Sequence, residues 1–396
     1  MSSALVAVSG ATTTHGLAAI RDLGRGGYKV VGTTFRPIAF NARSRWSRRY
    51  LTLPAPRDTK AMLEALARAG VEALLPMESS LVGALSCRNS EDQRRLSVAV
   101  PPLEGFRDAY DNRRTLERCQ RLGIPAPRLY RPQDARGMVV VKPREDVGAA
   151  RGVAFCRDAG ELDRALAACR VLGEPVVQEY VPGDTDAMRT VVLLFDRKTR
   201  LVAHFTTQKL EQHPATGGVT AMSVSTDERE LVELVLPFFD TLRWRGPAEV
   251  ELKVDARDGQ AKVIEVNPRL PGYVGLAVAC GLHLPRLAVQ VALGETPTAS
   301  GYAVGRRYVH PGLHAKVLLH AWRTGALTAA GLRRELPGLL TAPWLRWDDL
   351  ADPVPRLAKT FEELSGVEAG LAAEHRLRLQ DLERLAAGPE AGSQAA

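Results

Sequence analysis

The first 105 residues alternate between short apolar runs and helical patterns, and this alternation restricts the fold more than any other feature. In order, the segments are the strand ALVAVSG, the helix LAAIRDLGRGG, the strand YKVVGTT, the helix Thr59–Ala69, the strand VEALLPM, the helix SLVGALSC and the short strand SVAVPP. Strands that alternate with helices form a parallel sheet with helices on both faces. We therefore expect an α/β domain at residues 1–105.

The loop SGATTTHG follows the first of these strands. A strand, a loop with Gly10 and Gly16, a helix and a second strand are how a dinucleotide-binding fold begins. The second strand ends in VVGTTFR, without the Asp or Glu that holds an NAD ribose, whereas Arg36 is suited to the 2′-phosphate of NADP. An NADP-dependent oxidoreductase is therefore one hypothesis.

Composition is that of a globular protein, with 45% hydrophobic and 25% charged residues, and 396 residues suffice for two or three domains. No apolar run reaches the ~18 residues of a membrane span. The N-terminus lacks the pattern of a signal peptide. Five scattered cysteines without a CxxC pair favour reduced thiols, so we expect a cytoplasmic protein without a membrane partner.

The net charge of +8 is spread along the chain, and its densest run is RSRWSRR at Arg43–Arg49. Trp46 within this run is compatible with base stacking on RNA. The alternative is a solvated loop and helix turn between two strands. It is favoured because no second basic and aromatic patch accompanies the first, so we expect no nucleic-acid partner.

The rest of the chain divides into three regions. A helix, YDNRRTLERCQRLG, ends at Gly123 and precedes a small block with the strands MVVVKP, VAFC and PVVQEYV and the helix ELDRALAACRVLG. Residues 187–300 carry long runs typical of antiparallel strands. Beyond residue 300 the pattern is helical, and the tail AAGPEAGSQAA is predicted to be disordered.

The segment AEVELKVDARDGQAKVIEVNPR reads as a hairpin, because Asp258-Gly259 is a strong turn signal between two β-rich runs. If the hairpin centres on Asp258, Glu251 lies opposite Glu265. Asn267 shares the face of Glu265, since side chains two apart in a strand point the same way.

Like charges that face each other across a strand pair are unfavourable, so a cation is expected between Glu251 and Glu265. Carboxylates and an amide oxygen suit Mg²⁺, which proteins commonly hold with one or two carboxylates and substrate phosphates. The alternative is a solvated hairpin whose charges are balanced by Lys253 and Arg269.

Two further stretches carry chemistry. Lys142 ends an apolar strand and precedes a loop (residues 147–152) with Gly148 and Gly152, an arrangement suited to phosphates, although a surface lysine before a turn is the alternative. The strand VVQEYV ends at a Pro-Gly turn beside Glu179 and Asp186, where backbone groups are suited to a purine and a carboxylate to ribose hydroxyls.

Taken together, Lys142 with its glycine loop, QEYVPG and ELKVD…DGQ…VIEVNPR resemble, in order and spacing, the ATP-grasp superfamily over roughly residues 1–300. The fourteen-residue spacing of Glu251 and Glu265 is similar to that of the carbamoyl phosphate synthetase large chain. The resemblance implies a carboxylate–amine ligase that uses ATP and Mg²⁺, with Mn²⁺ as an alternative metal. It also implies that the N-terminal glycine loop lines the substrate cleft and does not bind a dinucleotide.

The resemblance assigns a role to each motif residue. The metal ligands would be Glu251, Glu265 and Asn267; the phosphate contacts Arg113, Lys142, Gly148 and Gly152; the adenine contacts Glu179, Tyr180 and Val181; and the ribose contact Asp186, where the family often has Glu.

The implied chemistry is attack of a carboxylate on the γ-phosphate, which gives an acyl phosphate and ADP, followed by amide formation with an amine. Arg269 would stabilise the transferring phosphoryl group or the oxyanion, and Lys209 would contact the donor carboxylate or the acyl phosphate. Its segment, FTTQKLEQHPATGG, is predicted to be a flexible loop over the substrate. His213 is a candidate base, although a solvated loop histidine is the favoured interpretation.

The predicted fold is α/β: an N-terminal Rossmann-like, pre-ATP-grasp parallel-sheet domain, then an α+β ATP-grasp fold with antiparallel sheets and a helical C-terminal extension. The predicted domains are 1–105, the N-terminal domain; 106–186, a linker helix and small lid; 187–300, the large subdomain with the Mg²⁺ site; and 301–396, the extension. In this extension His310, His314 and His320 suggest a metal, but Pro311-Gly312 interrupts the first pair, so a packing helix at Leu313–Trp322 is favoured. Trp344 and Trp347 are expected to cover the main domain.

The expected partners are a carboxylate and an amine, with amino acids as the expected substrates, and a homodimer is compatible with the resemblance. A biotin-dependent carboxylase or a carbamoyl phosphate synthetase subunit is disfavoured, since the chain has no second ATP-grasp half and no AMKM-like site. A non-catalytic ATP-binding module is the remaining alternative, although none of the expected metal ligands has been lost.

Overall fold

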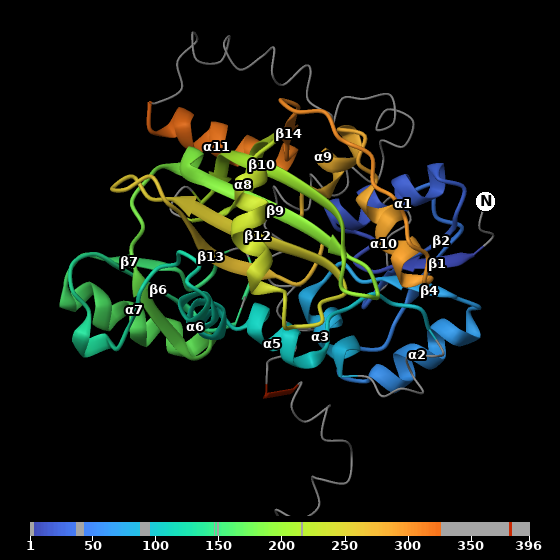
Figure 1. The fold of residues 1–396 in the computed structure, drawn as a ribbon, viewed down its shortest axis with the longest axis horizontal. Coiled ribbons are helices and arrows are strands. Elements are labelled where there is room, and N and C mark those ends of the chain that lie inside the picture. The colour runs from blue at the N-terminus through green and yellow to red at the C-terminus, as the bar shows by residue number, and fades with distance from the viewer. Residues whose placement is uncertain are drawn as a thin grey trace, which may run out of the picture.

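The computed structural model describes residues 4–36, 43–87, 96–145, 147–148, 150–214, 217–325 and 380–381. Three sheets organise this part of the chain: a parallel N-terminal sheet, a small antiparallel sheet and a large antiparallel sheet. The large sheet lies in the middle of the molecule, with the N-terminal sheet and the small sheet toward its two ends (Figure 1). The predicted combination of a parallel sheet with antiparallel sheets is confirmed.

The N-terminal sheet has the strand order β3-β2-β1-β4, and all of its pairs are parallel. Its strands are β1 (Leu5–Val8), β2 (Lys29–Thr34), β3 (Arg49–Thr52) and β4 (Ala73–Leu75), and its helices are α1 (Thr14–Arg25), α2 (Thr59–Arg68) and α3 (Ser79–Ser86). Strand β3 was not predicted, because its sequence continues the arginine-rich run. Trp46 in that run packs partly buried against the core beside α1, with Arg25 and Arg45 over its ring.

Two linker helices, α5 (Leu103–Tyr110) and α6 (Asn112–Leu122), lead to the small sheet. Helix α6 ends at Gly123, whose left-handed φ of 69° suits a residue without a Cβ. The small sheet has the order β5-β8-β6-β7 and is covered by α7 (Ala159–Leu172). Its strands are β5 (Leu129–Tyr130), β6 (Val139–Pro143), β7 (Ala154–Cys156) and β8 (Pro175–Glu179), with a 3-10 turn η2 at Pro132–Asp134.

The large sheet is antiparallel with the order β13-β12-β9-β10-β11-β14. Its strands are β9 (Met188–Phe195), β10 (Leu201–His213), β11 (Val219–Thr226), β12 (Gly246–Val254), β13 (Ala261–Asn267) and β14 (Arg307–Val309). Short 3-10 turns, η3 (Thr185–Ala187) and η4 (Leu236–Phe238), and the helix α8 (Arg229–Val235) connect its segments. The last strand, β14, lies beyond residue 300, so the predicted helical extension begins with a strand of this sheet.

Strand β10 corrects one prediction. The segment Phe205–His213 was expected to be a flexible loop, but it continues β10, with Phe205–Gln208 paired to β9 and Thr206–His213 paired to β11. Cross-strand hydrogen bonds on both edges hold a polar sequence in an extended form that its composition alone does not indicate.

The helices α9 (Val274–Ala279) and α10 (Leu284–Ala292) join the N-terminal domain to the large sheet. One hydrophobic cluster contains Ile20 of α1, Phe205 of β10, Leu276 of α9 and Val289 of α10, all fully buried. The two domains therefore share a core, which fixes the loop after β1 relative to the large sheet. Among the described residues, no helix combines the length and apolar character needed to cross a bilayer.

The last described long helix, α11 (Pro311–Arg323), packs on β10 and β11. It confirms the helix predicted at Leu313–Trp322. Trp344, Trp347 and the tail predicted to be disordered lie outside the described residues.

Candidate active site

The hairpin of β12 and β13 brings two carboxylates together. Glu251 pairs with Glu265, as the turn symmetry predicted, and Glu249 pairs with Asn267. A β-bulge shifts the register between Glu251 and Leu252. From Glu251 back to Glu249 the pairing is regular, so side chains alternate between the two faces of the sheet there. Three carboxylates and an amide therefore lie on adjacent positions of two strands.

The turn of this hairpin is held by Asp255. Its buried carboxylate accepts hydrogen bonds from Nε of Arg257 at 2.9 Å and from Nζ of Lys262 at 2.6 Å. The bonds from Arg257 and Lys262 outweigh burial and hold the pKa of Asp255 well below its usual range. Gly259 supplies the φ of 73° that the turn requires.

Two lysines from other strands reach this pair. Lys209 of β10 is buried, and its Nζ lies 3.4 Å from Oε2 of Glu251 and 3.4 Å from the carbonyl of Gly218. Lys142 of β6 is also buried, and its Nζ donates to the carbonyl of Ile264 at 2.9 Å. Lys142 of the small sheet thus places its ammonium beside Ile264, the residue before Glu265 in the large sheet.

Glu249 was not among the predicted site residues. Its Oε2 lies 3.2 Å from Nη1 of Arg269, and the carboxyl group is buried. Burial raises the pKa of Glu249 to about 7; the Arg269 guanidinium opposes this rise, and the charges of Glu251 and Glu265 add to it. The sequence signal was the spacing of Glu249 and Glu251, which puts both on one face of a strand.

Asn267 connects the two ends of the cluster. Its Nδ2 donates to Oε1 of Glu265 at 3.1 Å, and its Oδ1 accepts from Nη2 of Arg269 at 3.5 Å. No three His, Cys, Asp or Glu side chains in the described ranges are grouped closely enough to hold a metal by themselves. A magnesium ion with two carboxylates, an amide oxygen and phosphate oxygens as ligands fits this donor set.

The predicted adenine contacts lie at the end of β8. Glu179 pairs with Nη2 of Arg257 at 2.5 Å, and the backbone N–H of Arg128 donates to it at 3.2 Å. Partial burial opposes these bonds, but they lower the pKa of Glu179. The ring of Tyr180 lies 5.3 Å from the ammonium of Lys253, and Val181 is buried. Asp186, the predicted ribose contact, is exposed in the 3-10 turn η3.

The two predicted loop glycines both have left-handed backbone conformations. Gly148 has φ 74° and Gly152 φ 78°. A Cβ on Gly152 would lie 2.8 Å from a methyl group of Leu172 and 2.9 Å from the Pro143 ring, so the loop returns tightly onto the small sheet.

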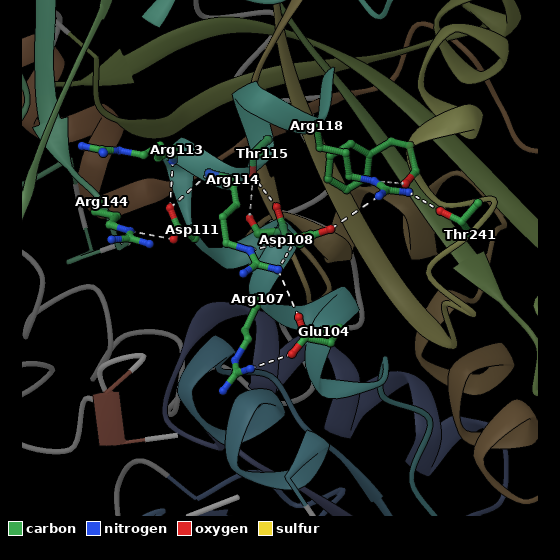
Figure 2. A network of polar contacts seen from close by, with 12 residues as sticks. Glu104, Arg107, Asp108, Asp111, Arg113, Arg114, Thr115, Arg118, Arg144 and Thr241 are labelled. Atoms are coloured by element: carbon green, nitrogen blue, oxygen red, sulfur yellow. Dashed lines mark hydrogen bonds and ion pairs between the residues drawn. The ribbon is translucent and has the colours of Figure 1, made fainter. Parts of the chain in front are cut away.

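Arg113 lies in a separate network of ion pairs at the start of α6 (Figure 2). Its guanidinium is 3.1 Å from Glu174, whose other oxygen pairs with Arg144 at 2.6 Å. Arg144 also pairs with the buried carboxylate of Asp111, which caps α6 by accepting from two backbone N–H groups. The ion pair with Glu174, directly before β8, therefore ties the Arg113 side chain to the small sheet.

The same helix is anchored to the large subdomain by Arg118. Its Nε donates to the carbonyl of Phe238 and its Nη2 to Thr241 Oγ1, both at 2.8 Å (Figure 2). Helix α6 consequently stands between the small sheet and the segment before β12, with polar contacts to both.

The histidines of the C-terminal region have structural partners. His314 is buried and its Nδ1 lies 2.6 Å from Glu211, while His310 contacts Thr14 Oγ1 at 3.2 Å and caps α11. These contacts agree with the favoured packing interpretation. His213 ends β10, and partial burial together with the charges of Lys316 and His320 lowers its pKa.

The loop after β1 encloses a carboxylate. Ser9 Oγ donates to Oε2 of Glu78, and the backbone N–H of Met77 donates to Ser9 Oγ at 2.8 Å. Gly10 has φ 59°, and a Cβ there would lie 2.8 Å from Oε1 of Glu78. Burial raises the pKa of Glu78, and the hydrogen bond from Ser9 and the charge of Arg269 oppose this rise.

The fold combines a parallel-sheet domain, a small antiparallel sheet and a large antiparallel sheet that carries the paired carboxylates. Residues 109–273 match the model of the ATP-grasp domain. This part of the chain is therefore an ATP-grasp domain, and the resemblance read from the motifs is confirmed.

Two curated proteins are similar over parts of the chain. The 5-formaminoimidazole-4-carboxamide-1-(beta)-D-ribofuranosyl 5'-monophosphate synthetase of Pyrobaculum neutrophilum is 39% identical over 95 residues, 23% of this chain and 26% of that protein. The D-aspartate ligase of Enterococcus faecium is 24% identical over 126 residues, 31% of this chain and 30% of that protein. The matches thus span less than a third of the length of either relative.

Solved structures show a wider likeness of fold. Biotin carboxylase from Campylobacter jejuni has a TM-score of 0.61 at 15% identity, over 76% of this chain and 74% of that one. An L-amino acid ligase from Bacillus licheniformis has a TM-score of 0.56 at 18% identity, over 73% and 74%. N5-carboxyaminoimidazole ribonucleotide synthetase from Thermotoga maritima has a TM-score of 0.57 at 14% identity, over 78% and 80%.

Proposed function

We propose that the protein is an ATP-dependent ligase that joins a carboxylate to an amine and releases ADP and phosphate. The observation that carries the proposal is the pairing of Glu251 with Glu265 at a position reached by the buried ammoniums of Lys209 and Lys142. Facing carboxylates with adjacent lysines suit a Mg²⁺-nucleotide, whose metal and phosphates need both signs of charge.

The proposed binding roles follow the motifs. Glu251, Glu265 and Asn267 hold Mg²⁺, which would neutralise charge on the phosphates when bound. Lys142, the loop of Gly148 and Gly152, and Arg113 contact the phosphates; Glu179, Tyr180 and the backbone of Val181 hold adenine, and Asp186 the ribose. To bind adenine, Glu179 must give up its ion pair with Arg257. To contact the phosphates, Arg113 must give up its ion pair with Glu174.

In the proposed reaction, a carboxylate oxygen of the substrate attacks the γ-phosphorus, and the bond to the β,γ-bridging oxygen breaks to release ADP. The amine nitrogen then attacks the acyl carbon, phosphate departs with the C–O bond electrons, and the nitrogen loses a proton. Arg269 stabilises the anionic oxygens from the position fixed by Glu249, and Lys209 orients the carboxylate.

Amino acids are the proposed substrates. A D-aspartate ligase and an L-amino acid ligase are among the similar proteins, which supports this class. The division at residues 105, 186 and 300, with the Mg²⁺ site in the third part and a homodimeric assembly, belongs to the same proposal. A biotin carboxylase domain dimer among the similar structures is compatible with the last point.

The test is to incubate the protein with Mg-ATP and pools of amino acids and other carboxylates, and to measure ADP, phosphate, AMP and pyrophosphate. Substrate-dependent ADP and phosphate that a Glu265→Gln variant does not form would support the acyl-phosphate route. AMP and pyrophosphate would indicate adenylation and contradict it. Absence of turnover with every pool would reject the ligase, and NADPH binding would then be measured.

A further inference from the structure

Glu78 is a carboxylate in the N-terminal domain that the proposed reaction has not used. It directly precedes helix α3 and is only partly exposed, under the Ser9–Gly10 loop. Ser9 Oγ donates to its Oε2, and the Ser9 hydroxyl is itself fixed by the Met77 N–H at 2.8 Å. The carboxylate is therefore held in one position by the loop.

This position excludes a phosphate from the loop. In dinucleotide folds the pyrophosphate binds where the glycine loop enters the first helix, because backbone N–H groups and the helix dipole attract anions there. Here Oε1 of Glu78 lies so close to Gly10 that a Cβ on Gly10 would be 2.8 Å from it. A resident carboxylate repels a pyrophosphate, so the loop suits a cation.

Among the described residues, no charged side chain is hydrogen bonded to Glu78. Its hydrogen-bond donors in the described ranges are neutral: the Ser9 hydroxyl and nearby backbone N–H groups. Arg269 acts on it at a distance but forms its own ion pair with Glu249. Burial raises the pKa of Glu78, and the hydrogen bonds from Ser9 and the backbone and the charge of Arg269 oppose this rise.

Glu78 also lies on the correct side of the hairpin. Arg269 follows Asn267 by two residues and is hydrogen bonded to it, and the chain neighbours of Arg269 and Glu78, Leu270 and Met77, are fully buried in one hydrophobic cluster. Carboxylates of the proposed metal site, the Arg269 guanidinium and the Glu78 carboxylate thus alternate in sign from the large sheet to the N-terminal domain. A positively charged group bound between Arg269 and the loop after β1 would continue this alternation of charge.

We propose that Glu78, held by Ser9, binds the ammonium group of the amine substrate and presents it to the acyl phosphate beside Arg269. This inference rests on the proposed ligase function and identifies its acceptor-binding residue. It gives the SGATTTHG loop a role as the amine side of the cleft. It also predicts that the acceptor is an amine that is protonated in solution, such as an amino acid or another primary amine.

The test compares two nucleophiles in the wild type and in Glu78→Gln, which keeps the shape of the side chain and removes its charge. With an amino acid as acceptor, we expect the KM for the amine to rise about tenfold or more, since a hydrogen bond to a charged group is lost. With hydroxylamine, which is neutral near pH 7, hydroxamate formation should change less than twofold. The KM values for ATP and for the carboxylate should also stay within twofold.

The hydroxylamine reaction also reports that Glu78→Gln is folded. Ser9→Ala, which removes the hydroxyl but leaves the carboxylate, should raise the same KM by a smaller factor. Glu72→Gln is the matched control, because Glu72 is an exposed carboxylate of the same domain that accepts from the Leu5 backbone.

An unchanged amine KM in Glu78→Gln would overturn the inference, and so would an increase confined to the KM of the carboxylate. Both outcomes leave the ligase intact. Absence of ADP formation by the wild type with every acceptor would overturn the ligase function itself, so the two failures are distinguishable.

Discussion

Glu251 lies directly opposite Glu265 across β12 and β13, and Nζ of Lys209 lies 3.4 Å from Oε2 of Glu251. Facing like charges destabilise a strand pair by a few tenths to about 1 kcal/mol. The hairpin therefore accepts a cost in the free protein that a divalent cation would remove.

Glu265→Gln should consequently stabilise the nucleotide-free protein, by about 0.5 kcal/mol, because it removes one of the two facing charges. The same variant should lose ATP turnover. Thermal unfolding with and without Mg-ATP measures stability and nucleotide binding, and ADP release measures turnover: the variant should have the higher Tm without ligand and the smaller increase with it. A lower Tm without ligand would contradict the repulsion.

Glu251→Gln should act in the opposite direction. It leaves the buried ammonium of Lys209 without its carboxylate, so we expect a loss of about 2 kcal/mol. Urea unfolding compares the stabilities of Glu265→Gln and Glu251→Gln. Glu233→Gln is the control, because Glu233 is an exposed carboxylate of α8. Equal effects of the two substitutions would mean that Lys209 does not distinguish them.

The turn of the hairpin gives a prediction on pH. Hydrogen bonds from Arg257 and then Lys262 lower the pKa of Asp255 in the folded protein, against the effect of burial. The unfolded chain then binds more protons than the folded one, so this stabilisation is present above the unfolded pKa of about 3.9 and is lost as the pH falls below it. Asp255→Asn should cost about 1.5 kcal/mol at pH 7.

At about pH 3 that difference should shrink, because the wild-type carboxylate begins to lose its advantage. Asp258→Asn is the control: Asp258 lies in the same turn, and Asn can still accept the 2.9 Å bond from the Gln260 backbone. A cost for Asp255→Asn that is the same at both pH values would show that charge is not its source.

The facing pair was predictable because a hairpin is local. Asp258-Gly259 marks the turn, but the pair also depends on the register shift after Glu251, since the residues nearer the turn pair Leu252 with Val263. Long-range structure was not accessible in the same way. The run RLVAHFTTQK is typical of a strand, but the segment that continues it to His213 reads as a polar loop until β11 pairs with it.

Residues whose function depends on distant neighbours were missed for the same reason. Glu249 is distinguished from a surface glutamate only by burial and by Arg269, and Glu78 only by the fold of the loop at Ser9 and Gly10. Neither residue has a motif of its own. Their environments are set by β-strand pairing and by helix packing across the two domains.

The loop after β1 should tolerate no side chain at Gly16. A Cβ there would lie 2.0 Å from the carbonyl oxygen of Gly10, a backbone atom that cannot move without disrupting the turn. Gly16→Ala should cost about 3 kcal/mol or more. Gly160→Ala in α7, where the nearest atom would be 3.4 Å away, should be neutral or slightly stabilising, since Ala favours helix. Chemical denaturation compares the two, and equal stabilities would contradict the steric argument.

The ion pairs at the start of α6 include two arginines with different expected roles (Figure 2). Arg144 is structural, and Arg113 is proposed to bind ATP. Asp111 is fully buried, caps the helix and pairs with Arg144 at 2.6 Å, so Asp111→Ala removes a cap and one of the two carboxylates that pair with Arg144, the other being Glu174. We expect a loss of about 2 kcal/mol, of which the cap contributes about 1 kcal/mol. Asp111→Asn, which can still cap, should lose less.

Arg113→Ala should change stability by less than about 0.5 kcal/mol, because its pair with Glu174 is half exposed. If Arg113 contacts the ATP phosphates in the working enzyme, the same variant should raise the KM for ATP while unfolding as the wild type does. Urea unfolding and ATP titration of Asp111→Ala and Arg113→Ala test this prediction. A stability loss for Arg113→Ala as large as that for Asp111→Ala, with an unchanged KM for ATP, would make Arg113 a structural residue of the linker and remove it from the nucleotide site.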